Sequence, residues 1–309
     1  MSKELYPLFG IITVLNTPFT ADNRPDYSAF RRHIEYAIRS GVAGFLVPAM
    51  ASEVHKLSVK ERLGLVETAL TTSAGRVPVI GGAGETDEQR RLEMVRQLLN
   101  LGCNNVLLQI PFSSNDEYRS AVLQAADLGP DMIMIQDWDF GGGGLPLDLI
   151  CRLFDEVDSF RCLKIETVPA GPKYSQVIAA TDNRLHVSGG WAVSTMIEGL
   201  ERGVHAFMPT ALHELYCLIY LLFQHGKKQE ATEWFHRILP VLAFSNQHLD
   251  ISIHFFKRLL CAQGIYNTAR VREPILPFDA VHKKQADELV SLAIELLAKA
   301  DERHSEILF

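Results

Sequence analysis

One short apolar run in this 309-residue sequence places a lysine where imine chemistry is possible. The run Cys162-Leu163-Lys164-Ile165-Glu166 has strand alternation, which sends Lys164 and Glu166 to one face and Leu163 and Ile165 to the other. Leu163 and Ile165 suit a face covered by helices, so we expect Lys164 to point inward. Burial disfavours the charged ammonium and leaves an amine that can condense with a carbonyl as a Schiff base. A lysine that reaches solvent, or that pairs with Glu166, fits the same spacing.

The elements that position this lysine follow a strand–loop–helix pattern. Eight short aliphatic or β-branched runs predict strands. They span residues 10–14, 44–47, 77–80, 105–108, 132–135, 162–165, 185–187 and 205–208. Amphipathic segments between them predict helices, among them 27–39, 59–72, 88–101, 116–126 and 147–157.

Two α/β architectures accommodate this alternation. A doubly wound open sheet usually stops at about five to seven strands, and its first strand often leads into a glycine-rich phosphate loop. Here the first strand runs into Leu15-Asn16-Thr17-Pro18-Phe19, which is no such loop. Eight units therefore favour a closed (β/α)₈ TIM barrel, in which the active site lies at the C-terminal ends of the strands.

The strand pattern stops near Pro209, and helical patterns follow at 212–225, 229–244, 251–262 and 285–300. Pro240 and the stretch 272–277 punctuate this region, and no Gly/Ser linker separates it from the rest. We therefore expect a barrel over residues 1–209 and a C-terminal helical extension over 210–309. The extension would pack on the barrel or form an oligomer contact.

Composition excludes several other classes of protein. Thirty Lys and Arg against thirty-seven Asp and Glu give a net charge of −7, which disfavours nucleic acid as a partner. The longest apolar stretch, 215–223, is shorter than the roughly 20 residues of a membrane span. The first seven residues do not resemble a secretory signal, so a cytoplasmic location is the default expectation.

Metal and redox sites have no support in the spacing of their usual ligands. The five cysteines include no Cys-x-x-Cys pair, and the eleven histidines show no His-x-His or His-x-x-x-His spacing. We expect reduced, mostly buried thiols and no metal. An imine mechanism needs no organic cofactor either.

A lysine on the sixth strand of an eight-unit barrel, followed by a helical tail, resembles the dihydrodipicolinate synthase and N-acetylneuraminate lyase family of class I aldolases. The resemblance spans nearly the whole chain, and besides the lysine four segments carry it. They are 10–19, which ends in Thr17-Pro18-Phe19; 52–58 with Glu61-Arg62; Val77-Pro78-Val79-Ile80-Gly81-Gly82-Ala83-Gly84; and Gln109-Ile110-Pro111-Phe112. The resemblance implies that Lys164 is the Schiff-base lysine and that Glu53 orients the substrate-binding turn.

The chain departs from the family pattern at the turn after the second strand. Where the family has a hydroxyl pair that holds the substrate carboxylate, this chain has Met50-Ala51, and Ser52 replaces the glycine that follows. Backbone N–H groups of the turn, around Ala51, could still cradle a carboxylate, with a further hydrogen bond from Ser52.

Three further departures concern the chemistry. The proton-relay tyrosine of the family aligns with Gln136, which cannot transfer protons, and a second tyrosine aligns with Ser113. The arginine that binds the aldehyde's carboxylate in the synthase falls within the run Gly141–Gly144. We therefore expect that the chain is not a dihydrodipicolinate synthase proper. Gln136 and Ser113 remain candidate substrate-binding residues.

Three carboxylates can replace the missing proton relay: Asp137, Asp139 and Glu166, at the ends of strands five and six. Glu166 is preferred because it shares a face with Lys164, and Asp137 is the second catalytic candidate. Strand alternation lets only one of Gln136 and Asp137 face inward. Each carboxylate could equally serve structure, by capping a helix or, for Glu166, by pairing with Lys173.

Two glycine-containing segments complete the candidate binding site. Trp138 and the glycine run behind it predict a flexible loop with an aromatic tip, which serves as a lid or as a plain connection. The turn Ser188-Gly189-Gly190-Trp191 lets a substrate approach the backbone of Gly189 and Gly190 closely.

Taken together, these observations predict a Schiff-base lyase that acts on a small 2-oxo acid, and the resemblance implies a 2-keto-3-deoxy sugar acid. The alternatives are an imine-dependent dehydratase and a non-catalytic barrel that binds an oxo acid. The helical tail and the family pattern imply a homo-oligomer, a tetramer or a dimer.

Overall fold

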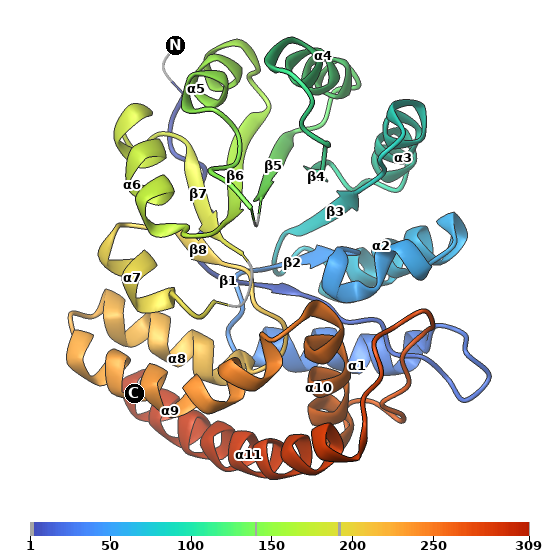
Figure 1. Ribbon diagram of the computed structural model, residues 1–309, viewed down its shortest axis with the longest axis vertical. Helices are drawn as coiled ribbons and strands as arrows, with labels where there is room; N and C mark the ends of the chain where they lie inside the picture. Colours follow the sequence, from blue (N-terminus) through green and yellow to red (C-terminus); the bar gives the residue numbers. More distant parts are fainter. Residues whose placement is uncertain (1–2, 140, 191–192, 309) are drawn as a thin grey trace. The chain divides into compact units, whose positions relative to one another are not determined.

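The computed structural model of the protein describes residues 3–139, 141–190 and 193–308. Its strands follow one another in chain order around a closed barrel, and the recorded pairings are parallel (Figure 1). The strands are β1 (Gly10–Val14), β2 (Gly44–Val47), β3 (Val79–Ala83), β4 (Asn105–Leu108), β5 (Met132–Asp139), β6 (Phe160–Thr167), β7 (His186–Gly189) and β8 (Ala206–Phe207). The predicted (β/α)₈ TIM barrel is confirmed.

The strands β5 and β6 are longer than their apolar runs predict. They pair from Ile133 and Phe160 as far as Asp139 and Thr167, with one irregularity between Ile133 and Met134. Backbone pairing with its neighbour therefore continues each strand beyond the apolar residues on which the prediction rested. Trp138 lies within β5 rather than at the tip of a loop, which corrects that expectation.

The helices agree closely with the amphipathic pattern. They are α1 (Tyr27–Arg39), α2 (Val59–Ser73), α3 (Glu88–Asn100), α4 (Asn115–Ala126), α5 (Leu147–Glu156), α6 (Gly171–Ala180), α7 (Met196–Glu201), α8 (His213–Gln224), α9 (Lys228–Ser245), α10 (Leu249–Ala262) and α11 (Ala280–Leu308), with two 3₁₀ turns, η1 (Met50–Ser52) and η2 (Val54–Lys56). Side-chain caps begin several of them: Asp26 accepts from the N–H of Ala29, and Ser58 forms a capping box with Glu61.

Pro240 lies inside α9 and does not interrupt it, in agreement with the helix predicted over 229–244. A proline removes one helical hydrogen bond and leaves the carbonyl of the residue four positions earlier without a partner. Here both Pro240 and His236 are exposed, so water can satisfy that carbonyl.

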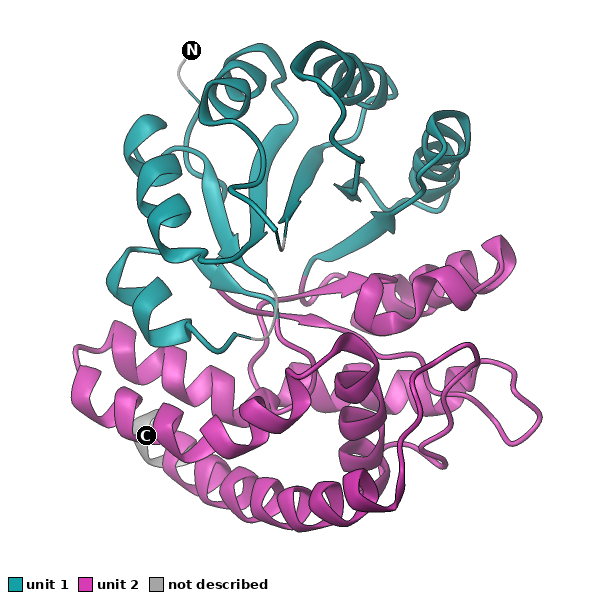
Figure 2. Ribbon diagram, in the orientation of Figure 1, with its two compact units in different colours: residues 1–9, 78–208 teal, residues 10–77, 209–309 magenta. Residues whose placement is uncertain are grey.

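The chain divides into two compact units, drawn in different colours in Figure 2. Unit 1 comprises residues 1–9 and 78–208, and carries β3 to β8 with α3 to α7. Unit 2 comprises residues 10–77 and 209–309, and groups the first two strands and helices with the C-terminal helices. The boundary at residue 209 between the barrel and a C-terminal helical extension stays a prediction.

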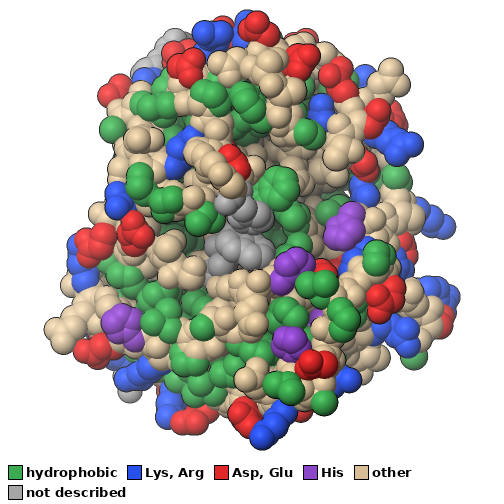
Figure 3. Space-filling model, in the orientation of Figure 1, with side chains coloured by type: hydrophobic (Ala, Val, Ile, Leu, Met, Phe, Trp, Pro, Cys, Tyr) green, Lys and Arg blue, Asp and Glu red, His purple; other side chains and the backbone are tan. Residues whose placement is uncertain are grey.

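In unit 1 the apolar residues of β4 to β6 are buried, including Ile133, Ile135, Leu163 and Ile165. Burial of such side chains on both sides of the strands is typical of a parallel sheet covered by helices. No helix among the described residues is both long enough and apolar enough to cross a membrane. Acidic and basic side chains are interspersed over the face drawn in Figure 3.

Candidate active site

Lys164 lies on β6 in unit 1 with only 4% of its surface exposed. It is in register with Gln136 of β5 on one side and with Ser188 of β7 on the other. Residues in register on neighbouring parallel strands point to the same side of the sheet. Gln136, Lys164 and Ser188 therefore share a face, opposite the face of Ile165. The inward orientation predicted for Lys164 agrees with this register.

Glu166 is the partner of Lys164. Its Oε1 atom lies 2.8 Å from Lys164 Nζ, and its Oε2 atom accepts a hydrogen bond from the side-chain amide of Gln136. Both charged side chains are buried, with 4% of Lys164 and 7% of Glu166 exposed. The structure thus brings together Lys164, Glu166 and Gln136, three residues that the sequence singled out.

Gly190 makes room for this carboxylate. A Cβ atom placed on Gly190 would lie 2.2 Å from Glu166 Oε1 and 2.3 Å from its Cγ, closer than such atoms approach in real structures. A side chain at position 190 would therefore displace Glu166 from Lys164. The sequence predicted that Gly190 lets a substrate approach the backbone. The structure adds a steric reason for a glycine here, which is the space that Glu166 occupies.

The alternatives for Lys164 are now resolved in part. The ammonium does not reach solvent, and it pairs with Glu166, as the spacing allowed. The pairing suggested between Glu166 and Lys173 is wrong, because Lys173 Nζ lies 3.5 Å from Asp137 and donates to the carbonyl oxygens of Gly143 and Leu145.

Asp137 lies on the other face of β5 from Gln136, so the structure does not bring it together with Lys164. Its Oδ1 atom accepts from the backbone N–H of Leu145 at 2.7 Å. Burial raises the pKa of Asp137, while that hydrogen bond and the nearby Lys173 ammonium act in the opposite direction. This placement favours a role in holding the loop before α5 over the predicted proton transfer near Lys164.

The glycine run after β5 is held at both ends. Asp139 accepts from the N–H of Gly141 at 2.9 Å and from the N–H of Gly144 at 3.2 Å. Gly144 has a φ of +72°, and a Cβ atom there would lie 2.2 Å from Asp137 Oδ1. Asp139 therefore organises this loop, which does not support its interpretation as a freely moving lid. Phe140, within the same loop, lies outside the described residues.

The remaining unit 1 candidates lie apart from the Lys164–Glu166 pair or at its edge. Trp138 is in register with Glu166, so it shares that face, and it is 45% exposed. Ser113 is exposed and donates to Glu117 at the start of α4. A Cβ atom on Gly189 would lie 2.9 Å from both Phe207 and the hydroxyl of Tyr174. Trp191, from the same turn, lies outside the described residues.

In unit 2 several hydrogen bonds fix the turn that follows β2. The buried hydroxyl of Ser52 donates to the carbonyl of Leu15 at 2.6 Å and accepts from the N–H of Ala49 at 3.0 Å. The carbonyls of Ala51 and Ser52 accept from the side chains of Asn16 and Thr17. The Ser52 hydroxyl is thus engaged in the fold, and within the described chain the Ala51 N–H has no partner. The role of this turn in binding a carboxylate stays a prediction.

Glu53, which follows this turn, is fully buried and adopts a left-handed backbone with a φ of +59°. It accepts from Lys257 Nζ of α10, from Lys56 Nζ at 3.3 Å and from the N–H of Arg272 at 3.0 Å. Lys257 is also fully buried, and burial lowers its pKa to about 8 against the opposing effect of Glu53. Lys257 was not among the predicted site residues, although its place beside Ile253, Phe256 and Leu260 on one face of a helix indicates an inward-facing lysine.

Within the described ranges no group of three or more His, Cys, Asp or Glu side chains could hold a metal ion. The cysteines are free thiols, and Cys103, Cys162 and Cys217 are buried. Burial raises the pKa of the Cys103 thiol to about 11.

Comparisons with known proteins agree with this architecture. The model of the dihydrodipicolinate synthetase family matches residues 7–293. A 4-hydroxy-tetrahydrodipicolinate synthase of Xanthomonas axonopodis pv. citri is 28% identical over 299 residues, which cover 94% of this chain and 96% of that protein. The enzyme of the same name from Xanthomonas campestris pv. campestris is 29% identical over 307 residues, with the same coverage.

Solved structures show the same fold at lower identity. The 4-hydroxy-tetrahydrodipicolinate synthase of Methylacidiphilum fumariolicum SolV superposes with a TM-score of 0.85 at 19% identity, covering 95% of this chain and 98% of its own. The N-acetylneuraminate lyase of Fusobacterium nucleatum gives 0.79 at 19% identity, covering 91% and 97%. Because the family model spans nearly the whole chain, this protein belongs to the dihydrodipicolinate synthetase family.

Proposed function

We propose that this protein forms a Schiff base between Lys164 and a small 2-oxo acid, and then makes or breaks a carbon–carbon bond. Membership of the family makes the chain an enzyme, a lyase of the class I aldolase type. The observation that carries the finer proposal is the buried contact of 2.8 Å between Lys164 Nζ and Glu166 Oε1.

The contact supplies the proton transfer that imine formation needs. Glu166 takes a proton from the Lys164 ammonium, and the neutral amine attacks the C2 carbonyl carbon of the oxo acid. Glu166 then returns the proton to the hydroxyl of the carbinolamine, which leaves as water. The product is a protonated imine that can accept an electron pair.

Carbon–carbon cleavage follows from this imine. A base removes the proton of the C4 hydroxyl, the C3–C4 bond breaks, and its electron pair moves into the imine to give an enamine and an aldehyde. Protonation of the enamine at C3 and hydrolysis release pyruvate and the free lysine. Glu166 is the described carboxylate nearest to Lys164 in unit 1 and is our candidate for this base.

Gln136 has a supporting part in this scheme. An amide cannot relay a proton at neutral pH, but its N–H donates to Glu166 Oε2 and stabilises the charged form of the carboxylate. Glu166 thereby replaces the tyrosine relay of the family pattern, and Gln136 positions it.

The resemblance suggests a 2-keto-3-deoxy sugar acid as substrate. The two Xanthomonas relatives are named 4-hydroxy-tetrahydrodipicolinate synthases, which suggests dihydrodipicolinate synthesis instead, at 28% and 29% identity. We favour the sugar acid because Gly141 to Gly144 stand where the synthase pattern has its carboxylate-binding arginine. The N–H groups of Gly141 and Gly144 donate to Asp139, and the carbonyl of Gly143 accepts from Lys173.

The test is borohydride trapping. The protein is incubated with pyruvate or with members of a panel of 2-keto-3-deoxy sugar acids, reduced, digested and analysed by peptide mass spectrometry. We expect the added mass on Lys164 and none in Lys164→Ala. Absence of an adduct with every oxo acid, in protein that is folded by circular dichroism, would refute the proposal.

Product analysis separates the two outcomes of the same imine. Pyruvate plus an aldehyde indicates aldol cleavage, whereas loss of water with every carbon retained indicates a dehydratase. Loss of water alone would contradict the proposed aldol cleavage but would remain consistent with an imine on Lys164. A control with pyruvate and aspartate semialdehyde tests the synthase activity, which we expect to be absent.

We also propose that the protein forms a homo-oligomer, a dimer or a tetramer, as the family pattern implies. Light scattering after size-exclusion chromatography measures the mass directly. A mass of 34.6 kDa, that of one chain, would contradict this proposal.

A further inference from the structure

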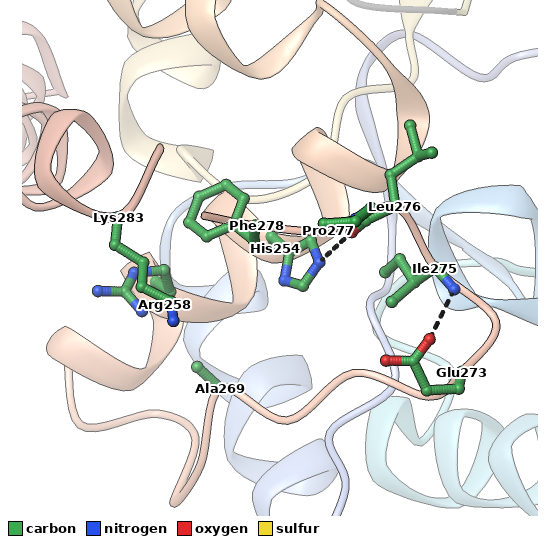
Figure 4. Close-up of a pocket in the computed structure, with 9 residues that line it drawn as sticks. All are labelled: His254, Arg258, Ala269, Glu273, Ile275, Leu276, Pro277, Phe278 and Lys283. Carbon is green, nitrogen blue, oxygen red and sulfur yellow. Dashed lines mark hydrogen bonds between the residues drawn. The ribbon is translucent and has the colours of Figure 1, made fainter. Parts of the chain in front are cut away.

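Unit 2 has a pocket lined by none of the candidate site residues named above (Figure 4). Its volume is about 420 Å³, which is within the usual range for sites that bind small molecules. α10, the segment before α11 and the first turns of α11 supply its walls. The lining residues are His254, Arg258, Ala269, Glu273, Ile275, Leu276, Pro277, Phe278 and Lys283.

The charges in this pocket are separated. Figure 4 shows Arg258 and Lys283 together at one end, Glu273 at the other, and His254 and Phe278 between them. Within the described part of the chain, the Lys283 ammonium has no ion-pair partner. Arg258 pairs with Asp287 through Nη2, but its buried Nε has no acceptor there. The basic end therefore offers an oxyanion the Lys283 ammonium and the exposed part of the Arg258 guanidinium.

The middle of the pocket is flat and aromatic. The rings of His254 and Phe278 are stacked, with centroids 4.7 Å apart and an interplanar angle of 19°. Phe278 is stacked in turn on His282, at 5.4 Å. His254 Nε2 is bonded to the carbonyl of Leu276, so its ring is fixed in this orientation. Phe278 is itself buried, so a planar ligand in this pocket would stack on the half-buried ring of His254.

The acidic end accepts hydrogen bonds. Glu273 Oε2 accepts from the N–H of Ile275 at 3.0 Å, a local contact that leaves its second oxygen for a donor on a ligand. We propose that this pocket binds a flat aromatic molecule with an oxyanion at one end, held by Arg258 and Lys283, and a hydroxyl or amine donor at the other, held by Glu273.

Two residues that line the pocket are adjacent in the chain to residues that donate hydrogen bonds to Glu53. Arg258 follows Lys257, whose ammonium donates to Glu53, and Glu273 follows Arg272, whose N–H donates to the same carboxylate. Glu53 ends the turn Met50–Ser52 and begins the turn Val54–Lys56. A ligand that draws the two walls together therefore tightens the hydrogen bonds of these turns. This inference does not depend on the proposed imine chemistry.

The first experiment measures binding by isothermal titration calorimetry with 4-hydroxybenzoate as the probe. We expect saturable binding with a Kd of about 1 mM, as for a ligand of this size in a fitted pocket. Lys283→Gln should weaken binding about tenfold, the value of one charge-assisted hydrogen bond. Lys284→Gln makes the same charge change on the next residue of α11, outside the lining, and should leave the Kd unchanged.

The uncharged analogue 4-hydroxybenzyl alcohol should bind at least about tenfold more weakly than the acid. No saturation by 4-hydroxybenzoate at about ten times the expected Kd would overturn the proposal. Equal weakening by Lys283→Gln and Lys284→Gln would also overturn it, because binding would then follow only the net charge.

The second experiment tests the link to the turns by hydrogen exchange. With saturating 4-hydroxybenzoate, backbone amides of residues 53–57 should exchange about threefold more slowly, and those of helix α4 in unit 1 should not change. Unchanged exchange at 53–57 with binding intact would overturn the coupling to Glu53. Neither measurement requires Lys164, so Lys164→Ala should give the same results.

Discussion

Glu166 lies between two partners, with Oε1 2.8 Å from Lys164 Nζ and Oε2 bonded to the side chain of Gln136. The three side chains share one face of β5 and β6, which the register of the strands fixes. A carboxylate that is hydrogen-bonded at both oxygens has its position defined before a substrate arrives. This arrangement makes Glu166 the described group best placed to exchange protons with Lys164.

We predict that Glu166→Gln lowers the rate of borohydride trapping by about 10²–10⁴-fold, because general acid–base catalysis contributes on that scale. The amide keeps the shape of the side chain but cannot take the proton of the lysine. The remaining trapping should increase with pH, since the free amine would then depend on bases in solution. Quench-flow trapping with pyruvate across a range of pH measures both effects.

A matched control is Glu156→Gln in α5, which removes an exposed carboxylate that pairs with Arg119 in the same unit. It should trap pyruvate at the wild-type rate. Wild-type trapping by Glu166→Gln, with an unchanged dependence on pH, would show that Glu166 holds Lys164 in place without transferring its proton.

Gly190→Ala should lower activity by about tenfold or more, because the new methyl group overlaps Glu166 Oε1 and forces the carboxylate away from Lys164. Gly143→Ala is the matched control, since a Cβ atom there meets no described atom within 4 Å. Its activity should equal that of the wild type. A crystal structure of the Gly190→Ala variant with Glu166 still 2.8 Å from Lys164 would contradict the steric argument.

The sequence predicted the barrel and the position of Lys164 because both depend on periodicity along the chain. Alternation alone placed Lys164 and Glu166 on one face, and both are buried there. Alternation could not decide which of Gln136 and Asp137 faces Lys164, because strand β5 continues beyond its apolar residues. Pairing with β6 decides it, and that is a contact between segments about 30 residues apart.

Other parts of the candidate site depend on contacts that no local pattern contains. The Ser52 hydroxyl was a candidate hydrogen-bond donor to a substrate carboxylate. In the structure it donates instead to the carbonyl of Leu15, 37 residues earlier in the chain. Glu53 is held by Lys257, 204 residues later. Such pairings follow from the closure of the fold, so the sequence identified the turn but not what secures it.

We predict that Lys257→Met destabilises the protein by about 3–5 kcal/mol, because it leaves Glu53 buried without its closest cation. The double variant Glu53→Gln/Lys257→Met should lose less than the sum of the single variants, since it removes the isolated charge. Urea denaturation measures each free energy of unfolding. Lys299→Met, which breaks the exposed pair with Glu295, should cost no more than about 1 kcal/mol. Strict additivity in the double variant would contradict a direct interaction.

A chain of buried hydrogen bonds in unit 2 leads to a prediction about pH. His33 lies between Tyr266, at 2.9 Å from Nδ1, and His213, at 3.0 Å from Nε2. Tyr266 donates to the carbonyl of Asn16, so it accepts from His33 Nδ1, and a neutral His33 must then accept from His213 Nε2. His213 Nδ1 is left to accept from the hydroxyl of Thr13. Every bond of the chain therefore requires both histidines to be neutral.

Burial lowers the pKa of His213 to about 3 and that of His33 well below its usual value. Between about pH 6.5 and that lowered value, the unfolded chain binds protons that the native protein does not, so stability falls as the pH falls. Each such proton adds about 1.4 kcal/mol per pH unit to the slope of the free energy of unfolding against pH.

We predict that His213→Gln, which keeps a donor and an acceptor, reduces this slope by about one proton. The variant should also lower the free energy of unfolding by about 1–3 kcal/mol at pH 7. His236→Gln changes an exposed histidine and should leave the slope as it is. Urea titrations at pH 7, 6 and 5 give the slopes, and a His213→Gln slope equal to that of the wild type would mean that the native histidine binds protons as readily as the unfolded one.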